Sequence, residues 1–185
     1  GQLTGKITAN VFSKNSSEYH GTGFYLGEDS GDNAIISSNF FLYNTISGDE
    51  KLRGSGFYSN QNVTVINNTF CGEGTEGSSA NISNGAPASL FRNNIFADQH
   101  TAIWEEGELN LVITHNDFHN VTDILYRNSQ PLGNDIDYLE LLLSDLSHNN
   151  NWSPGFVGEN ADSGTWSQNP VYHAEGNTTT FTDYS

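Results

Sequence analysis

Carboxylates crowd one short stretch of this sequence. Glu105, Glu106 and Glu108 stand within four consecutive positions. A glycoside hydrolase needs two or three carboxylates held at a defined separation, one as general acid and another as base or nucleophile. Carboxylates drawn from a single turn do not have that separation built in, so a solvated acidic turn is the plainer interpretation.

Two further groups combine carboxylates with imidazoles: Asp98 with His100, and Asp117 with His115 and His119. Such groups could bind a metal or transfer protons. His115 and Asp117 flank an asparagine and share an outward direction only if the chain bends between them. Neither group forms a recognisable catalytic motif, so the sequence predicts no catalytic residue.

Calcium suits the acidic turns better than catalysis does, because it is bound by hard oxygen ligands. The two candidate ligand sets are Glu28, Asp29 and Asp32, and Glu105, Glu106 and Glu108. Neither turn matches the EF-hand loop or the RTX repeat. We expect no cofactor to be required, and Ca²⁺ is the ion that these turns would take up.

Three aromatic residues, Tyr25, Tyr58 and Trp104, hold equivalent positions in a repeated segment. If they face outward, they form a glycan-binding or adhesive strip. If they face inward, they stack in the core, and we expect the core for two of the three.

Asparagine followed by any residue and then Ser or Thr is the N-glycosylation sequon, and this composition produces several by chance. The candidate glycosylation sites are Asn15, Asn62, Asn81, Asn120, Asn151 and Asn177. A further sequon at Asn67 lies beside the main repeat and is a poor acceptor if its side chain is engaged there.

A repeated segment positions all of these residues. Its pattern is an apolar residue, two free positions, Asn, one free position and Phe, as in residues 65–70. The repeated asparagines are Asn10, Asn39, Asn68, Asn94 and Asn116, at steps of 29, 29, 26 and 22 residues. A sixth, degenerate copy is expected at Asn150-Asn151-Trp152. The chain must bend at each Asn, because the flanking apolar residues would otherwise lie on opposite faces of a strand.

Asparagine suits such a bend for two reasons. It tolerates the left-handed backbone conformation better than any residue except glycine. Identical Asn side chains stacked in successive layers can also hydrogen-bond to one another. We therefore predict an Asn ladder, with each Asn itself in the left-handed conformation.

A second pattern, Ser or Thr followed by a small residue and apolar residues, repeats in step with the first. Its copies begin at Thr22, Ser55, Ser79, Thr101 and Thr122. Three short strands in each repeat of 22–29 residues describe one coil of a stacked solenoid. The sequence predicts an all-β solenoid, a parallel β-helix of about five to six coils, with coils over residues 1–126.

The chain resembles the right-handed parallel β-helix, or pectate-lyase-like, superfamily. In that superfamily an Asn ladder occupies a tight turn between two of the three strands, and the five repeated asparagines match it. The resemblance covers roughly residues 3–126. It implies the fold but no activity, because lyases, hydrolases, adhesins and structural proteins share it.

A lyase of this superfamily would need a Lys or Arg base and a cation that neutralises a uronate carboxylate. Arg92 and Arg127 are the candidates, and neither lies in a catalytic motif that the resemblance supplies. Solvated or ion-paired arginines are the expected outcome.

The repeat stops after Tyr126, and residues 127–185 are expected to close the same domain. Asn134-Asp135 is typical of a helix N-cap. Apolar residues then follow at helical spacing: Ile136, Leu139, Leu142, Leu143 and Leu146. We predict an amphipathic helix over residues 135–147 that caps the solenoid, followed by a Thr-rich tail.

The formal net charge of −16, from 22 acidic and 6 basic residues, argues against nucleic acid and anionic membranes as partners. No apolar run is long enough to enter a bilayer as a span. The single cysteine, Cys71, excludes an internal disulfide and fits a strand as a small residue.

These properties indicate a secreted or cell-surface protein that acts by self-assembly or adhesion without catalysis. The first coil lacks a preceding strand of the second pattern, so its edge should be open to end-to-end stacking or to a neighbour's tail. The alternative is a carbohydrate-active enzyme, either a polysaccharide lyase or a glycoside hydrolase, or a glycan-binding module for extracellular polysaccharide.

Overall fold

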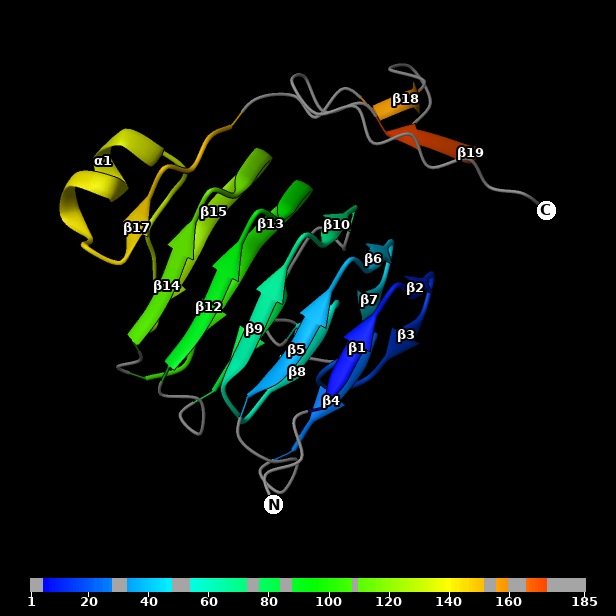
Figure 1. Cartoon of the computed structure of the whole chain (residues 1–185), viewed down its shortest axis with the longest axis horizontal. Helices are drawn as coiled ribbons and strands as arrows, with labels where there is room; N and C mark the ends of the chain where they lie inside the picture. The colour runs from blue at the N-terminus through cyan, green and yellow to red at the C-terminus, as the bar shows by residue number, and fades with distance from the viewer. Residues whose placement is uncertain are drawn as a thin grey trace. The chain divides into compact units, whose positions relative to one another are not determined.

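A computed structural model describes residues 5–27, 33–47, 54–72, 77–83, 88–107, 110–151, 156–159 and 166–172. The chain divides into two compact units, residues 1–151 and residues 152–185. The first unit is an all-β parallel solenoid of about four turns with one short helix (Figure 1). The predicted fold class is confirmed, with fewer full turns than the five to six expected because the coils at the two ends are partial.

One side of the solenoid is a parallel sheet with one strand from each coil (Figure 1). Its strands, in hydrogen-bonded order, are β1 (Lys6–Thr8), β5 (Ala34–Ser37), β9 (Val63–Ile66), β12 (Ala88–Arg92), β14 (Asn110–Thr114) and β17 (Leu146–Ser147). Alternate residues of each strand face the interior, where Ile36, Val65 and Ile113 are fully buried.

The other two strand rows belong to one nine-stranded sheet. The row that follows the Asn turns contains β2 (Val11–Ser13), β6 (Phe40–Leu42) and β10 (Thr69–Cys71). The next row contains β4 (Phe24–Leu26), β8 (Phe57–Ser59) and β11 (Ser78–Ile82). Two long strands, β13 (Ile95–Glu105) and β15 (Asp117–Arg127), run through both rows and join them.

Short strands complete the first unit. The pair β3 (Ser16–Ser17) and β7 (Thr45–Ile46) forms a small parallel sheet in the first two coils. The strand β16 (Gln130–Pro131) turns back antiparallel to the end of β15.

A column of phenylalanine rings forms much of the core. Its members are Phe12, Phe41, Phe70, Phe96 and Phe118, with successive ring centroids 5.0, 4.6, 4.7 and 5.2 Å apart. Each Phe lies two residues after a ladder Asn, so the bend does return this position to the interior. Parallel strands about 4.8 Å apart bring identical rings into stacking distance.

The left-handed residue at each bend is the one before the Asn, not the Asn itself. Its φ is 54–57° in all six coils, at Ala9, Ser38, Asn67, Asn93, His115 and His148. The predicted left-handed Asn is therefore wrong, because the ladder uses the Asn side chain for hydrogen bonding and leaves the strained φ to its neighbour. The sixth rung is Asn149, one residue before the expected copy, since Leu146 pairs in register with Ile113.

The second pattern is shifted by one residue in two coils. Ala80 pairs with both Phe57 and Ile103, and Ile103 pairs with Leu125. The segments equivalent to residues 55–58 are therefore 78–81 and 123–126. In this register Asn81 lies beside Tyr58, where the pattern has an apolar residue, and Asp123 lies beside Thr101, where it has Ser or Thr, so both residues depart from the pattern.

The helix α1 (Ile136–Leu142) covers the C-terminal end of the solenoid (Figure 1). Its N-cap is Asp135, as predicted, whose Oδ1 accepts a hydrogen bond of 3.0 Å from the backbone N–H of Tyr138. Ile136 and Leu139 are buried against the core. The helix ends five residues earlier than predicted because the following chain becomes extended and adds β17 to the sheet.

In the second unit, β18 (Phe156–Glu159) pairs antiparallel with β19 (Trp166–Tyr172). Across the parts of the chain that the structure describes, no helix has the length and apolar character of a membrane span.

Candidate functional site

The Asn ladder connects neighbouring coils with the same hydrogen bonds at each rung. The backbone N–H and the Nδ2 of Asn39 donate to Asn68 Oδ1 at 2.9 and 3.0 Å. The same Nδ2 donates backward to the carbonyl of Ile7 at 2.9 Å. Asn68, Asn94 and Asn116 repeat this arrangement. At each of these rungs the backbone N–H and Nδ2 donate to the Asn of the next coil, and Oδ1 accepts from the Asn of the preceding coil.

A second, shorter ladder joins the first two coils and was missed from the sequence. The backbone N–H and Nδ2 of Asn15 donate to Asn44 Oδ1 at 3.1 and 3.0 Å. Asn44 is fully buried, and its Nδ2 donates to the carbonyl of Phe12 at 3.0 Å. Each of these asparagines follows a left-handed residue, Lys14 or Tyr43, as in the main ladder.

The C-terminal end of the main ladder is closed by a helix residue. Glu140 Oε1, from α1, accepts hydrogen bonds from the backbone N–H of Asn149 at 2.7 Å and from its Nδ2 at 3.1 Å. These are the two donors that Oδ1 of a next coil would accept. The helix thus terminates the ladder as well as the core.

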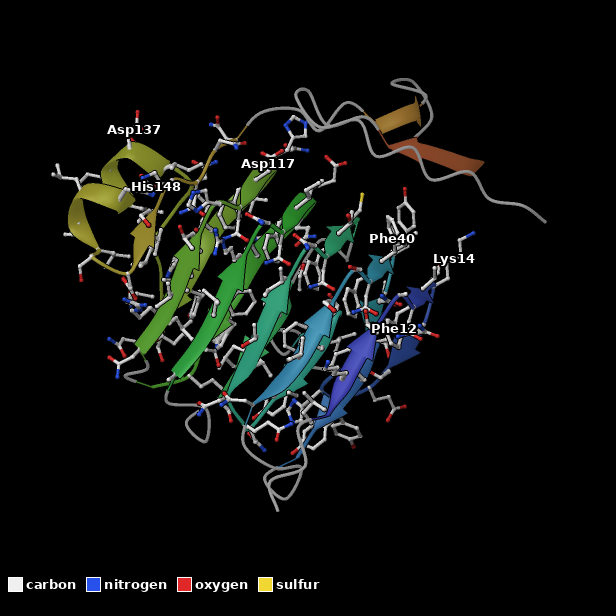
Figure 2. All side chains as sticks on the ribbon, in the orientation of Figure 1. Phe12, Lys14, Phe40, Asp117, Asp137 and His148 are labelled. Carbon is white, nitrogen blue, oxygen red and sulfur yellow. The ribbon has the colours of Figure 1, made fainter. Side chains whose placement is uncertain are left out.

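The N-terminal end is different. The strands β1, β2, β3 and β4 each pair on one side only within the described residues. The core side chains of this coil, Ile7, Phe12, Phe24 and Leu26, are only partly buried. Figure 2 labels Phe12 and Lys14 in this end coil, with Lys14 pointing away from the solenoid.

The end rungs differ from the inner ones in their hydrogen bonding. Asn10 Nδ2 donates to Thr8 O of its own coil at 2.9 Å, as Asn68 and Asn116 also do within their coils, but within the described residues it has no counterpart of the bond that Asn39 Nδ2 makes to the carbonyl of Ile7 in the preceding coil. In the described part of the chain, no donor reaches Oδ1 of Asn10 or of Asn15. Among the described residues, the N-terminal coil therefore presents an open strand edge, an open core end and two open amide acceptors.

The three candidate glycan-binding aromatics lie in one row on the outward side of their strands. Register places Tyr25 beside Tyr58, then Asn81, Trp104 and finally Tyr126, which the sequence had not singled out. The preceding residue of each strand faces the core, so the expectation that two of the three aromatics point inward is wrong.

Ring stacking limits what this row can bind. Tyr25 and Tyr58 stack at 5.2 Å between centroids and 6° between planes, and Trp104 and Tyr126 stack at 3.6 Å and 14°. His20 stacks on Tyr58 at 4.8 Å, and Tyr58 is only 6% exposed, whereas Tyr25 is 51% exposed. The rings cover one another's faces, which are the surfaces that stack on a sugar.

The acidic turn after β13 is partly a structural ion network. Glu105 is 1% exposed because it lies in register with buried Ile82, on the inward side of its strand. Arg127 pairs with Glu105 and with Asp145, which joins the end of the second row to the start of β17. Burial lowers the pKa of Arg127, but hydrogen bonds and charge attraction from Asp145 and Glu105 outweigh this, so its pKa is raised. The expected ion-paired arginine is confirmed at Arg127.

This network argues against Glu105 as a calcium ligand or catalytic group, because its buried carboxylate already pairs with the partly buried guanidinium of Arg127. Glu106, on the outward side, accepts a hydrogen bond of 3.1 Å from Asn81 Nδ2. The remaining proposed ligands, Glu28, Asp29, Asp32 and Glu108, lie outside the described residues.

Within the described ranges, no group of three or more His, Cys, Asp or Glu side chains is placed to hold a metal ion. His115 stacks instead on His148 of the next coil at 4.9 Å, and Asp98 accepts a hydrogen bond of 2.8 Å from Asn120. Arg92 is exposed on β12, and Cys71 is buried and forms no disulfide within the described residues. Calcium binding by the turn at residues 28–32 stays a prediction.

The sequons lie in unequal surroundings. Asn15, Asn120 and Asn151 are exposed, and Asn62 is partly buried with its Oδ1 bonded to the backbone N–H of Ala88. Asn81 is fully buried, which is incompatible with a glycan in this fold. Asn177 lies outside the described residues.

Comparison of the chain with protein-family models, with curated proteins and with solved structures finds no match in any of the three. Arguments about function therefore depend on the geometry of the site.

Proposed function

We propose that this chain is a non-catalytic structural module of an extracellular or cell-surface protein, which assembles by accepting β-strands at its N-terminal end. The observation that carries the proposal is the difference between the two ends of the solenoid. The helix α1 and Glu140 close the C-terminal end, while the N-terminal coil, in the part of the chain that the structure describes, leaves its strands β1–β4 unpaired on one side.

An unpaired parallel edge favours strand addition, because main-chain hydrogen bonds supply affinity and the adjoining core supplies apolar burial. The half-buried rings of Phe12 and Phe24 would become fully buried beneath an added coil. Filaments formed by stacking both ends gain no support, since α1 occupies the end that a second subunit would need. The assembly proposed here uses one end only, with a neighbour's tail strand as a possible added strand.

Three features support the non-catalytic and extracellular parts of the proposal. Glu105 and Arg127, which were candidates for acid–base catalysis, form an ion pair with each other in which Glu105 is buried. Sequence composition, rich in Asn, Ser, Thr and Gly with 22 acidic residues, fits a secreted repeat protein. The pectate-lyase-like superfamily, to which the sequence bears a resemblance, includes structural and adhesive members.

Sedimentation velocity of the full chain over a range of concentrations tests the assembly. We expect reversible association for the unmodified protein and for Val112→Lys, and a monomer for Val11→Lys. Val11 and Val112 are exposed strand residues, at 66% and 47%, but only Val11 lies on the open edge. A charged residue on an edge strand opposes pairing. A monomer at every concentration would overturn self-association, and equal loss in both variants would show a non-specific charge effect.

Glycan binding is a second candidate function, which the half-exposed Tyr25 favours. Its hydroxyl accepts a hydrogen bond of 2.9 Å from Asn60 Nδ2, so aromatic and amide groups meet at one surface. Calorimetric titration with cellohexaose, a neutral β-linked probe, should give binding that Tyr25→Ala abolishes. Tyr138→Ala on α1, where Tyr138 is 56% exposed, is the matched control. No heat of binding, or equal loss in both variants, counts against a site on this row.

A further inference from the structure

The open ladder rungs specify what the N-terminal end can accept. At every inner rung, Oδ1 receives two donors from the preceding coil, the backbone N–H and the Nδ2 of an Asn. For Asn39 these come from Asn10, at 3.0 and 3.1 Å. For Asn44 they come from Asn15, at 3.1 and 3.0 Å. Oδ1 of Asn10 and of Asn15 occupy the corresponding acceptor positions at the end of each ladder.

The spacing of the two rungs sets a sequence requirement. Asn10 and Asn15 are five residues apart, as are Asn39 and Asn44 in the next coil. A parallel chain that carries asparagines at the same spacing satisfies both acceptors in the way that Asn10 and Asn15 satisfy Asn39 and Asn44. A one-residue slip of such a strand would turn its side chains to the opposite face.

The core end adds a requirement between the two asparagines. Phe12 stacks on Phe41 at 5.0 Å and 10° on one side, and its column ends there. A ring two residues after the first incoming Asn would extend the column and bury the exposed part of Phe12. Ile7, three residues before Asn10, is also partly buried, so an apolar residue three positions before the first incoming Asn would pack on it.

We propose that the N-terminal end is a docking site for a parallel β-solenoid coil that carries two asparagines five residues apart, with an aromatic residue two positions after the first. The inference rests on the proposed role of this end in assembly and names the chemistry of the partner. Continuity with the existing interface supports it, because the first and second coils already meet in this way. The N-terminal end of a second copy cannot serve, since its ladders also present acceptors without donors.

The test duplicates residues 5–33 and inserts the copy between residues 4 and 5 of the full chain. The insertion places new asparagines 29 residues before Asn10 and Asn15, which is the natural step between the first two coils. Hydrogen exchange of the amides in β1 and β2, measured by mass spectrometry, reports whether the added coil docks. We expect these amides to exchange on the order of tenfold more slowly with the inserted coil than without it.

Two variants distinguish recognition by the two asparagines, called the asparagine code below, from strand addition that needs no particular sequence. In one, both inserted asparagines are replaced by Ala; in the other, the insert is intact and the receiving residues carry Asn10→Ala and Asn15→Ala. The variant without Asn10 and Asn15 should lose most of the added protection because both acceptors are gone. The variant without the inserted asparagines should lose a smaller part, because its backbone N–H groups still donate, and exchange of β9 and β12 stays unchanged as a check on folding. Equal protection with and without asparagines would overturn the code and leave assembly at this end standing. No protection from any insert would overturn both proposals.

Discussion

Replacing a central ladder residue, Asn68→Ala, should destabilise the solenoid far more than the same change at the end rung, Asn10→Ala. Asn68 is 1% exposed. Its Nδ2 donates to Ile36 O at 2.9 Å and to Asn94 Oδ1 at 3.0 Å, and its Oδ1 accepts from the backbone N–H and Nδ2 of Asn39 at 2.9 and 3.0 Å. Alanine removes all of these side-chain bonds.

The magnitude follows from the groups left unpaired. Two donors of Asn39, itself buried, lose their acceptor, and a buried unsatisfied polar group costs about 1–3 kcal/mol. We therefore expect Asn68→Ala to lower the free energy of unfolding by roughly 3–5 kcal/mol. Asn10 is exposed, and Asn39 Oδ1 keeps the backbone N–H of residue 10, so Asn10→Ala should change it by about 0.5 kcal/mol or less.

Urea unfolding followed by far-UV circular dichroism measures both variants, with a common slope as the sign that the same surface unfolds. Asn68→Asp separates hydrogen bonding from cavity formation because it is nearly isosteric. It replaces the Nδ2 donor by a carboxylate oxygen that faces Ile36 O and Asn94 Oδ1. It should therefore destabilise at neutral pH at least as much as alanine does. Equal and small effects of Asn68→Ala and Asn10→Ala would refute the view that the ladder stabilises the stacked coils.

Three further substitutions test other parts of the structure. Arg127→Ala leaves Glu105 buried without its partner and should destabilise by about 3–5 kcal/mol, and adding Glu105→Leu should recover much of this in thermal or urea unfolding; no recovery would contradict the pairing. The raised pKa of Arg127 means that its contribution to this stabilisation is present through the neutral range and is lost as the pH rises to strongly alkaline values. Gly54→Ala should destabilise about 1–3 kcal/mol more than Gly133→Ala, because both have positive φ but only at Gly54 would a Cβ lie 2.0 Å from a carbonyl, that of Phe57; similar unfolding midpoints would count against this. Asp135→Ala removes the N-cap of α1 and should lower stability by about 1 kcal/mol, and an unchanged midpoint would show that the cap is dispensable.

Most of the fold could be predicted because the same residue types recur at equivalent positions of successive coils, where their side chains stack on one another. An Asn and a Phe two residues later recur in five coils, and both stack in the structure. The second ladder was missed because only two residues, Asn15 and Asn44, form it, and two copies do not establish a repeat. Their shared step of 29 residues with Asn10 and Asn39 was the available signal.

The errors have local physical causes. The bend places the left-handed φ on the residue before the repeated Asn, where four of the six coils hold Asn or His, at Asn67, Asn93, His115 and His148. These types adopt that conformation readily, but the prediction assigned it to the repeated Asn instead. The helix stops early because an open sheet edge competes for the segment around Leu146. The inward direction of Glu105 follows from strand alternation with Ile103, but a carboxylate in that position was not anticipated.

The central claim is that the chain assembles by accepting strands at its N-terminal end. The most direct measurement is hydrogen exchange of the unmodified full chain at low and high protein concentration, resolved by segment. The account predicts that amides in β1–β4 exchange more slowly at high concentration, while those in α1 and β17 do not change. Concentration-independent exchange throughout, or slowing confined to the helix-capped end, would contradict it.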